Sequence, residues 1–214
     1  MTTRRPSAIL FDLGNVLVHI SPEAFLQRLG LDTPENRRLY GVHVNEIVRE
    51  YECGNESTNV FLSRLESLFN DAQPEGGAAP PRGTISREDL RDAMHAVIGK
   101  PVGGMFELVT RLHGVVPLSL LSNTNPLHYD WCMEHLPVLQ LLSSHFLSYQ
   151  LQSLKPSARI FAQVVERLQI TPGDIFYIDD MAENVEAGRR AGLDSHLFLG
   201  LAELERALRA TGLG

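Results

Sequence analysis

Residues 8–14 read AILFDLG: an apolar run leads to a single carboxylate, Asp12, and a glycine follows two places later. Consecutive apolar residues bounded by a turn-forming residue predict a short, buried β-strand over 8–12. Packing does not explain the charge at its end, because a buried carboxylate without a partner is costly. The end of this strand is therefore the first place to look for a functional site.

The same pattern recurs further along the chain. Strand-like runs alternate with segments whose apolar residues are three or four apart, which is typical of βα units around a parallel sheet. We expect further strands at 117–122, 145–149, 174–179 and 195–199, and helices at 157–168, 182–191 and 201–210. The predicted fold class is α/β, with a doubly wound parallel sheet.

The segment 20–100 interrupts this alternation with helical patterns and almost no strand signal. Ser57 is placed to cap one helix, and Ser86 with Asp89 to cap a second, whose apolar face runs to Val97 and Ile98 before Gly99 and Pro101 end it. Between them, residues 70–84 are rich in proline and glycine, which predicts a flexible excursion. We expect an α/β core over 1–19 and 101–214 and a small inserted helical domain over 20–100.

Composition narrows the function classes. The 214 residues carry a formal net charge of −7, and the basic residues are scattered, so a nucleic-acid partner is not expected. Only two cysteines occur, Cys53 and Cys132, which predicts neither a disulfide framework nor a zinc site and fits a reducing cytoplasm. Asp12 and Gly14 break the first apolar stretch, so we expect neither a signal peptide nor a membrane span.

Polar residues end several of the predicted strands. Ligands of open parallel sheets bind outside the carboxyl ends of the strands, where this chain has Asp12, Ser122, Asn123, Asp179 and Asp180. Three carboxylates in one crevice need a counter-charge, and oxygen ligands without a His or Cys cluster indicate Mg²⁺. Lys155, in a loop before a predicted helix, supplies a positive charge for an anionic group.

Taken singly, these residues have ordinary structural explanations, such as a helix cap, a turn or a solvated lysine. Their joint placement at the strand ends of one sheet is harder to explain in that way. Carboxylates, a hydroxyl, an amide, a lysine and a metal describe a site for phosphoryl transfer through a covalent aspartyl intermediate.

With these residues in place, the chain resembles the haloacid dehalogenase-like hydrolase superfamily. Four motifs match in order, namely FDLGNVL with Asp12, LLSNTN with Ser122, LKP with Lys155 and FYIDDMAEN with Asp179, Asp180 and Asn184. The FDLGN opening, the segment LSNTNPLH (121–128) and the segment KPSARI (155–160) are most similar to bacterial sugar-phosphate phosphatases of the α-D-glucose-1-phosphate phosphatase type. The insertion, with its YECG turn at 51–54, then resembles the helical cap that covers the site in this family.

The resemblance implies a role for each motif residue. It makes Asp12 the nucleophile and a Mg²⁺ ligand, with the backbone carbonyl of Gly14 as a further ligand. In the same way, Asp180 would complete the metal site with help from Asp179. Ser122 and Asn123 would bind phosphoryl oxygens, and Lys155 would balance their charge. Asn184 would support Lys155 or the metal shell. The substrate that the resemblance implies is a small phosphorylated metabolite of the sugar-phosphate type.

The sequence departs from the superfamily's pattern at Gly14, where most of its phosphatases have a second Asp that protonates the leaving oxygen. Without that acid, substrates whose leaving oxygen is already a tolerable anion, such as an anomeric, enol or acyl oxygen, lose least. If another group supplies the proton, His19 or a residue of the cap is the first candidate.

Two other functions remain open from the sequence. One is a metal-free haloacid dehalogenase, whose last motif lacks a carboxylate; the presence of both Asp179 and Asp180 favours phosphate instead. The other is a catalytically weak binding or regulatory protein, which only Gly14 suggests. The sequence predicts no oligomeric state.

Overall fold

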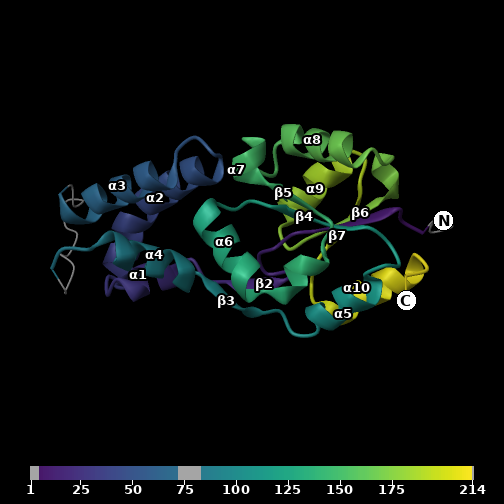
Figure 1. The fold of residues 1–214 in the computed structure, drawn as a ribbon, viewed down its shortest axis with the longest axis horizontal. Coiled ribbons are helices and arrows are strands. Elements are labelled where there is room, and N and C mark those ends of the chain that lie inside the picture. The colour runs from purple at the N-terminus through teal and green to yellow at the C-terminus, as the bar shows by residue number, and fades with distance from the viewer. Residues whose placement is uncertain (1–4, 72–82, 214) are drawn as a thin grey trace.

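A computed structural model describes residues 5–71 and 83–213. Its centre is a five-stranded parallel sheet in the order β5-β4-β1-β6-β7 (Figure 1). The strands are β1 (Ala8–Phe11), β4 (Leu118–Ser122), β5 (Ser144–Leu147), β6 (Ile175–Asp179) and β7 (Asp194–Leu197). β1 pairs with β4 on one side and β6 on the other, which places the ends of these three strands next to one another. The predicted α/β class with a parallel sheet is confirmed.

Helices cover both faces of this sheet (Figure 1). One apolar cluster joins it to α5 (Met105–Leu112), α6 (Pro126–His135), the 3₁₀ helix η1 (Pro137–Leu141) and α10 (Leu201–Ala210). A second cluster on the other face includes α7 (Ser148–Leu151), α8 (Ala158–Leu168) and α9 (Ala182–Arg190). A short 3₁₀ helix, η2 (Pro172–Asp174), leads into β6. β1 is buried throughout, as a central strand covered on both faces must be.

Four helices lie together at one end of the molecule (Figure 1). They are α1 (Glu23–Arg28), α2 (Pro34–Glu52), α3 (Thr58–Asn70) and α4 (Arg87–Ala96), and they share a separate apolar cluster. The two predicted caps are confirmed, since the Ser57 side chain accepts from the Val60 amide and Ser86 forms a capping box with Asp89. We call these four helices the cap.

The expectation of almost no strand in the insertion was wrong at its edges. β2 (Val18–Ile20) and β3 (Ile98–Pro101) form a two-stranded antiparallel ribbon that connects the sheet to the cap. α4 therefore ends at Ala96, and Ile98 belongs to a strand rather than to the helix face. A Cβ on Gly99 would lie 3.0 Å from the His19 carbonyl oxygen, so glycine permits the close approach of the two strands.

The strand after η1 and the region between α3 and α4 also differ from, or fall outside, what the sequence predicted. The strand predicted at 145–149 ends at Leu147, and Ser148 begins α7. Most of the proposed flexible excursion, residues 72–82, lies outside the described residues, and the domain boundaries at 19 and 101 stay a prediction. Within the described ranges, the helices are too short or too polar to cross a membrane.

Candidate functional site

Lys155 lies at the centre of the strand-end cluster. Its Nζ is 2.7 Å from Asp12 Oδ1, 2.6 Å from Asp179 Oδ2 and 3.1 Å from the Leu121 carbonyl oxygen. β1, β4 and β6 each supply one of these contacts at or just beyond the strand's carboxyl end. The predicted meeting of Asp12, Asp179 and Lys155 is therefore seen directly in the structure.

Asp179 is held by more donors than Lys155 alone. It is fully buried and accepts hydrogen bonds from the Tyr177 hydroxyl, from the Met181 amide at 2.8 Å and from Asn184 Nδ2 at 3.0 and 3.2 Å. Both of its oxygens are engaged, so its orientation is fixed by the surrounding chain. Asn184 acts on Asp179 and through it on Lys155.

The pKa values follow this arrangement. Burial raises the pKa of Asp12 to about 6; the charge of Lys155 opposes the rise and that of Asp179 adds to it. Burial alone would raise the pKa of Asp179 as well, but the charge and hydrogen bond of Lys155 outweigh burial and lower it. Burial would lower the pKa of Lys155, whereas the two carboxylates raise it. The lysine therefore stays charged.

A third carboxylate, Asp180, completes the cluster. One oxygen each of Asp12, Asp179 and Asp180 lies within 4.8 Å of the others. Asp180 is less buried than the other two, and its Oδ2 accepts from Asn15 Nδ2 at 3.1 Å. With one lysine against three carboxylates, two formal negative charges are left over, and the hard oxygen donors fit a divalent cation such as Mg²⁺.

Asn123 also has a position that the sequence did not reveal. Its Oδ1 accepts from the Lys155 amide at 2.8 Å, and its Nδ2 donates to the Lys155 carbonyl oxygen at 3.0 Å. This pair of hydrogen bonds ties the loop after β4 to the loop that carries Lys155. Ser122 is buried beside it, at the end of β4.

Gly14 lies in the loop that follows Asp12, and its backbone does not have a positive φ. A Cβ added there would lie 3.1 Å from Ile20 Cδ1, the end of a flexible and exposed side chain. Local backbone conformation therefore does not require glycine at this position.

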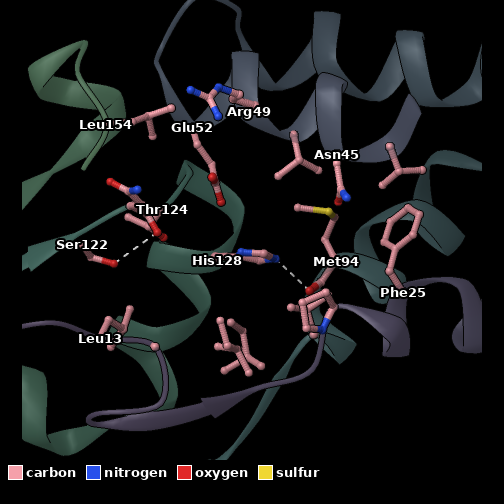
Figure 2. Close-up of a pocket in the computed structure, with 18 of the residues that line it drawn as sticks. Leu13, Phe25, Asn45, Arg49, Glu52, Met94, Ser122, Thr124, His128 and Leu154 are labelled. Carbon is pink, nitrogen blue, oxygen red and sulfur yellow. Dashed lines mark hydrogen bonds between the residues drawn. The ribbon is translucent and has the colours of Figure 1, made fainter. Parts of the chain in front are cut away.

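A cavity of about 620 Å³ lies between the cluster and the cap. Gly14, Ser122, Asn123 and Lys155 line it from the core, and Asp12 next to them keeps 7% of its surface exposed. From the cap, the walls include Phe25, Asn45, Arg49, Glu52 and Met94 (Figure 2). Glu46 lines the cavity as well. This volume is within the range of small-molecule sites.

The cap residues of this cavity were not identified individually from the sequence. Helical periodicity locates the face of α2 that packs against the rest of the cap, but it does not show which polar residues of α2 point into the site. The only signal was the YECG turn at 51–54, which the family resemblance placed over the site and which contains Glu52. His19, the other candidate for an acid, is exposed on β2 and is not one of the cavity's lining residues.

His128, on α6, lies on the wall between core and cap (Figure 2). Its Nε2 is 2.9 Å from the Met94 carbonyl oxygen, and its Nδ1 is 3.1 Å from Asn125 Nδ2. A carbonyl can only accept, so Nε2 carries the proton and Nδ1 accepts from Asn125. Burial lowers the pKa of His128 to about 4, so this neutral imidazole joins α6 to α4.

A second contact between cap and core lies at the end of α2. The Ser148 hydroxyl donates to the Glu52 carbonyl oxygen at 2.7 Å and accepts from the Thr124 amide at 2.9 Å. Gly54, at φ +74°, lies so close that a Cβ there would be 2.1 Å from the Tyr149 carbonyl oxygen. Any side chain at Gly54 would push the end of α2 away from α7.

Comparison with known proteins agrees with this geometry. The family model of haloacid dehalogenase-like hydrolases matches residues 6–192. A D-ribitol-5-phosphate phosphatase of Bacteroides thetaiotaomicron is 26% identical over 196 residues, which cover 87% of this chain and 89% of that protein. The chain belongs to the haloacid dehalogenase-like hydrolase family, and it is a hydrolase of that fold.

Solved structures show the same architecture. A haloacid dehalogenase family enzyme of B. thetaiotaomicron superposes with a TM-score of 0.79 at 22% identity, over 95% of this chain and 100% of that one. The same enzyme in complex with magnesium and inorganic phosphate gives a TM-score of 0.72 at 21% identity, over 90% of this chain and 93% of that one. These likenesses establish the fold of core and cap together.

Proposed function

We propose that this chain is a Mg²⁺-dependent phosphatase that hydrolyses a small phosphorylated polyol or sugar through an aspartyl-phosphate intermediate. The observation that carries the proposal is the cluster of Asp12, Asp179 and Asp180 around Lys155, whose side chain lines the cavity between core and cap. Such a site combines an anionic nucleophile, a place for a divalent cation and a fixed positive charge.

In this mechanism, a carboxylate oxygen of Asp12 attacks the phosphorus atom of the ester. Lys155 balances charge on the phosphoryl oxygens, and Ser122 with the Asn123 segment binds them. The metal, held by Asp12, the Gly14 carbonyl and Asp180, would supply electrostatic stabilisation of the transferring group. Asp179 and Asn184 keep Lys155 in place, and water then releases phosphate from Asp12.

The substrate class rests on size and on the relatives. The cavity holds a small molecule, and both polar and apolar side chains of the cap line it. A relative of known activity is a D-ribitol-5-phosphate phosphatase, and a structural neighbour binds magnesium and inorganic phosphate. A polyol phosphate such as D-ribitol 5-phosphate is therefore the first ester to assay, with sugar phosphates next. Cytoplasmic location and the lack of a nucleic-acid partner stay predictions.

The nucleophile gives the direct test. Asp12→Asn keeps the size of the side chain but removes the attacking anion, so phosphate release should fall by at least about 10³-fold. In the wild-type protein, rapid quenching at acid pH followed by peptide mass spectrometry should find phosphate on Asp12. Turnover by Asp12→Asn close to the wild-type rate would rule out the aspartyl-phosphate mechanism.

A further inference from the structure

The proposed reaction lacks an acid at residue 14, and two carboxyl groups of the cap line the cavity. Glu46 is exposed, whereas Glu52 is partly buried, so Glu52 is the better candidate to replace that acid. The ribitol phosphatase relative acts on a primary alkyl phosphate. The leaving group of such an ester is a strongly basic alkoxide, so efficient cleavage requires that its oxygen be protonated as it departs. Glycine at residue 14 cannot give that proton. We propose that Glu52, at the carboxyl end of α2, is the general acid that protonates the leaving oxygen.

The position of Glu52 supports this role. It lines the cavity together with Ser122, Asn123 and Lys155, and its carboxyl group points into the cavity between Thr124 and His128 (Figure 2). The leaving group of a phosphoryl transfer departs in line with and away from the nucleophile. With Asp12 on the core side, that direction leads towards the cap.

The backbone of Glu52 is fixed relative to the loop after β4, which carries the proposed phosphate-binding residues Ser122 and Asn123. Ser148 contacts both the Glu52 carbonyl oxygen and the Thr124 amide, two residues after Ser122. The backbone of Gly54 lies directly against Tyr149, which glycine permits, so the same end of α2 packs closely on the core. Glu52 therefore belongs to the cap, but its position relative to the core is fixed, as is required of a group that donates a proton to a bound substrate.

The electrostatic surroundings of Glu52 are suited to proton donation at neutral pH. Burial raises the pKa of Glu52 to about 7, although a hydrogen bond from Asn125 and the charge of Arg49 oppose the rise. The other titratable groups along the cavity are Glu46 on α2, His128 on α6 and Lys155 before α8, and Tyr149 on α7 lies beside Gly54. His128 is neutral, so it adds no charge beside the carboxyl group.

The proton balance closes over both half-reactions. In the first, the bond between phosphorus and the leaving oxygen breaks, Asp12 is phosphorylated, and the proton of Glu52 passes to the leaving oxygen to give the alcohol. In the second, water attacks the phosphorus atom and gives a proton to Glu52. The bond between phosphorus and the Asp12 oxygen breaks, which restores the Asp12 carboxylate and releases inorganic phosphate. This inference rests on the proposed phosphatase function and adds the acid and base to it.

The test compares two esters with leaving groups of different basicity. D-ribitol 5-phosphate needs the acid, whereas p-nitrophenyl phosphate leaves as a stable phenolate and does not. We expect Glu52→Gln to lower kcat on the ribitol ester by about 10²-fold or more, and to change that on the aryl ester less than about threefold. The matched control is Glu50→Gln, on the same helix and outside this cavity, which should leave both rates unchanged.

The pH profile adds an independent readout. With the ribitol ester, the wild-type rate should fall above about pH 7, and this basic limb should vanish in Glu52→Gln but persist in Glu52→Asp, which keeps a carboxyl group. Equal losses on both esters, a rise in KM alone, or an unchanged rate on the ribitol ester would overturn the role of Glu52. A wild-type protein that hydrolyses neither ester with Mg²⁺ would instead overturn the phosphatase proposal itself.

Discussion

The carboxylates at the strand ends lie behind the core side of the cavity, next to Lys155, whereas Glu52 lines the cavity from the cap, and the two kinds of carboxyl group are held in different ways. We call these two sides the core wall and the cap wall. Asp179 is fully buried, accepts hydrogen bonds from four groups and has a lowered pKa. Glu52 is partly buried, and its pKa is raised to about 7. The charge of Lys155 lowers the pKa of Asp179 and limits the rise at Asp12, where burial still raises the pKa to about 6, whereas at Glu52 burial dominates.

This contrast separates two tasks within one site. The core wall keeps carboxylates ionised for a metal and for nucleophilic attack, and the cap wall can keep a carboxyl group protonated near neutral pH. Pairs of acidic groups whose surroundings push their pKa values apart are a common basis for acid and base roles in catalysis. Each of the following predictions changes one side of this contrast.

The largest effect is expected from removing the most accessible carboxylate of the core wall. Asp180→Ala should lower turnover by about 10³-fold and abolish the response to added Mg²⁺, since it removes a metal charge and one of the three clustered carboxylates. The measurement is phosphate release during a Mg²⁺ titration, with Asp194→Asn at the opposite end of the sheet as control. Phosphate release by the wild type that survives a chelator unchanged would contradict the role of a metal, and halide release from a 2-haloacid under the same conditions would point to the metal-free dehalogenase instead.

A smaller effect, on stability, is expected from removing the counter-charge. Lys155→Met should lower the free energy of unfolding by about 3–5 kcal/mol in metal-free buffer at neutral pH, because it leaves buried carboxylates unpaired. Urea unfolding measures this, with Lys100→Met on exposed β3 as the control, since Lys100 is the chain's other lysine. A loss as small as the control's would mean that the ion pairs contribute little to stability.

The smallest effect concerns the cap wall and depends on pH. The pKa of Glu52 is raised from 4.5 to about 7 in the folded protein, so the folded state binds its proton more tightly than the unfolded state does. The wild type should therefore lose stability as pH rises from about 4.5 to 7, and it should not regain it above pH 7. Glu52→Gln removes this loss.

The variant should thus be similar to the wild type near pH 4.5 and more stable at pH 8, by on the order of 2 kcal/mol, since one pKa unit corresponds to about 1.4 kcal/mol and the side chain is partly exposed. Urea unfolding at the two pH values measures the difference, with Glu50→Gln as control. A stability gain of the same size at both pH values would show that Glu52 does not titrate in this range.

Much of the core wall could be predicted from the sequence because its signals are local. The apolar run before Asp12 and its counterparts before Ser122 and Asp179 each indicate a buried strand, and parallel strands place their carboxyl ends at one edge. The capping box of Ser86 and Asp89 is likewise a signal within four residues. The positions of the strands, the starts of several helices and the carboxylate cluster follow from such short segments.

The cap wall and the ribbon depended on the tertiary structure. β2 and β3 are short strands that pair with each other across a separation of about eighty residues, and neither has enough length to show a period of its own. Asn123 holds Lys155 through contacts between two loops, which no spacing in the sequence encodes.

Glu52 shows the same division most clearly. The sequence predicts that Glu52 lies in a turn at 51–54, whereas it is the last residue of α2. Its place over the site is set by contacts with Ser148, Thr124 and Tyr149, where the end of α2 meets the core. Its raised pKa arises from burial by residues distant in the chain. The sequence determined which carboxyl groups the protein has and which strands carry three of them, and the packing of cap on core decided which one can keep its proton, because desolvation depends on all the atoms nearby.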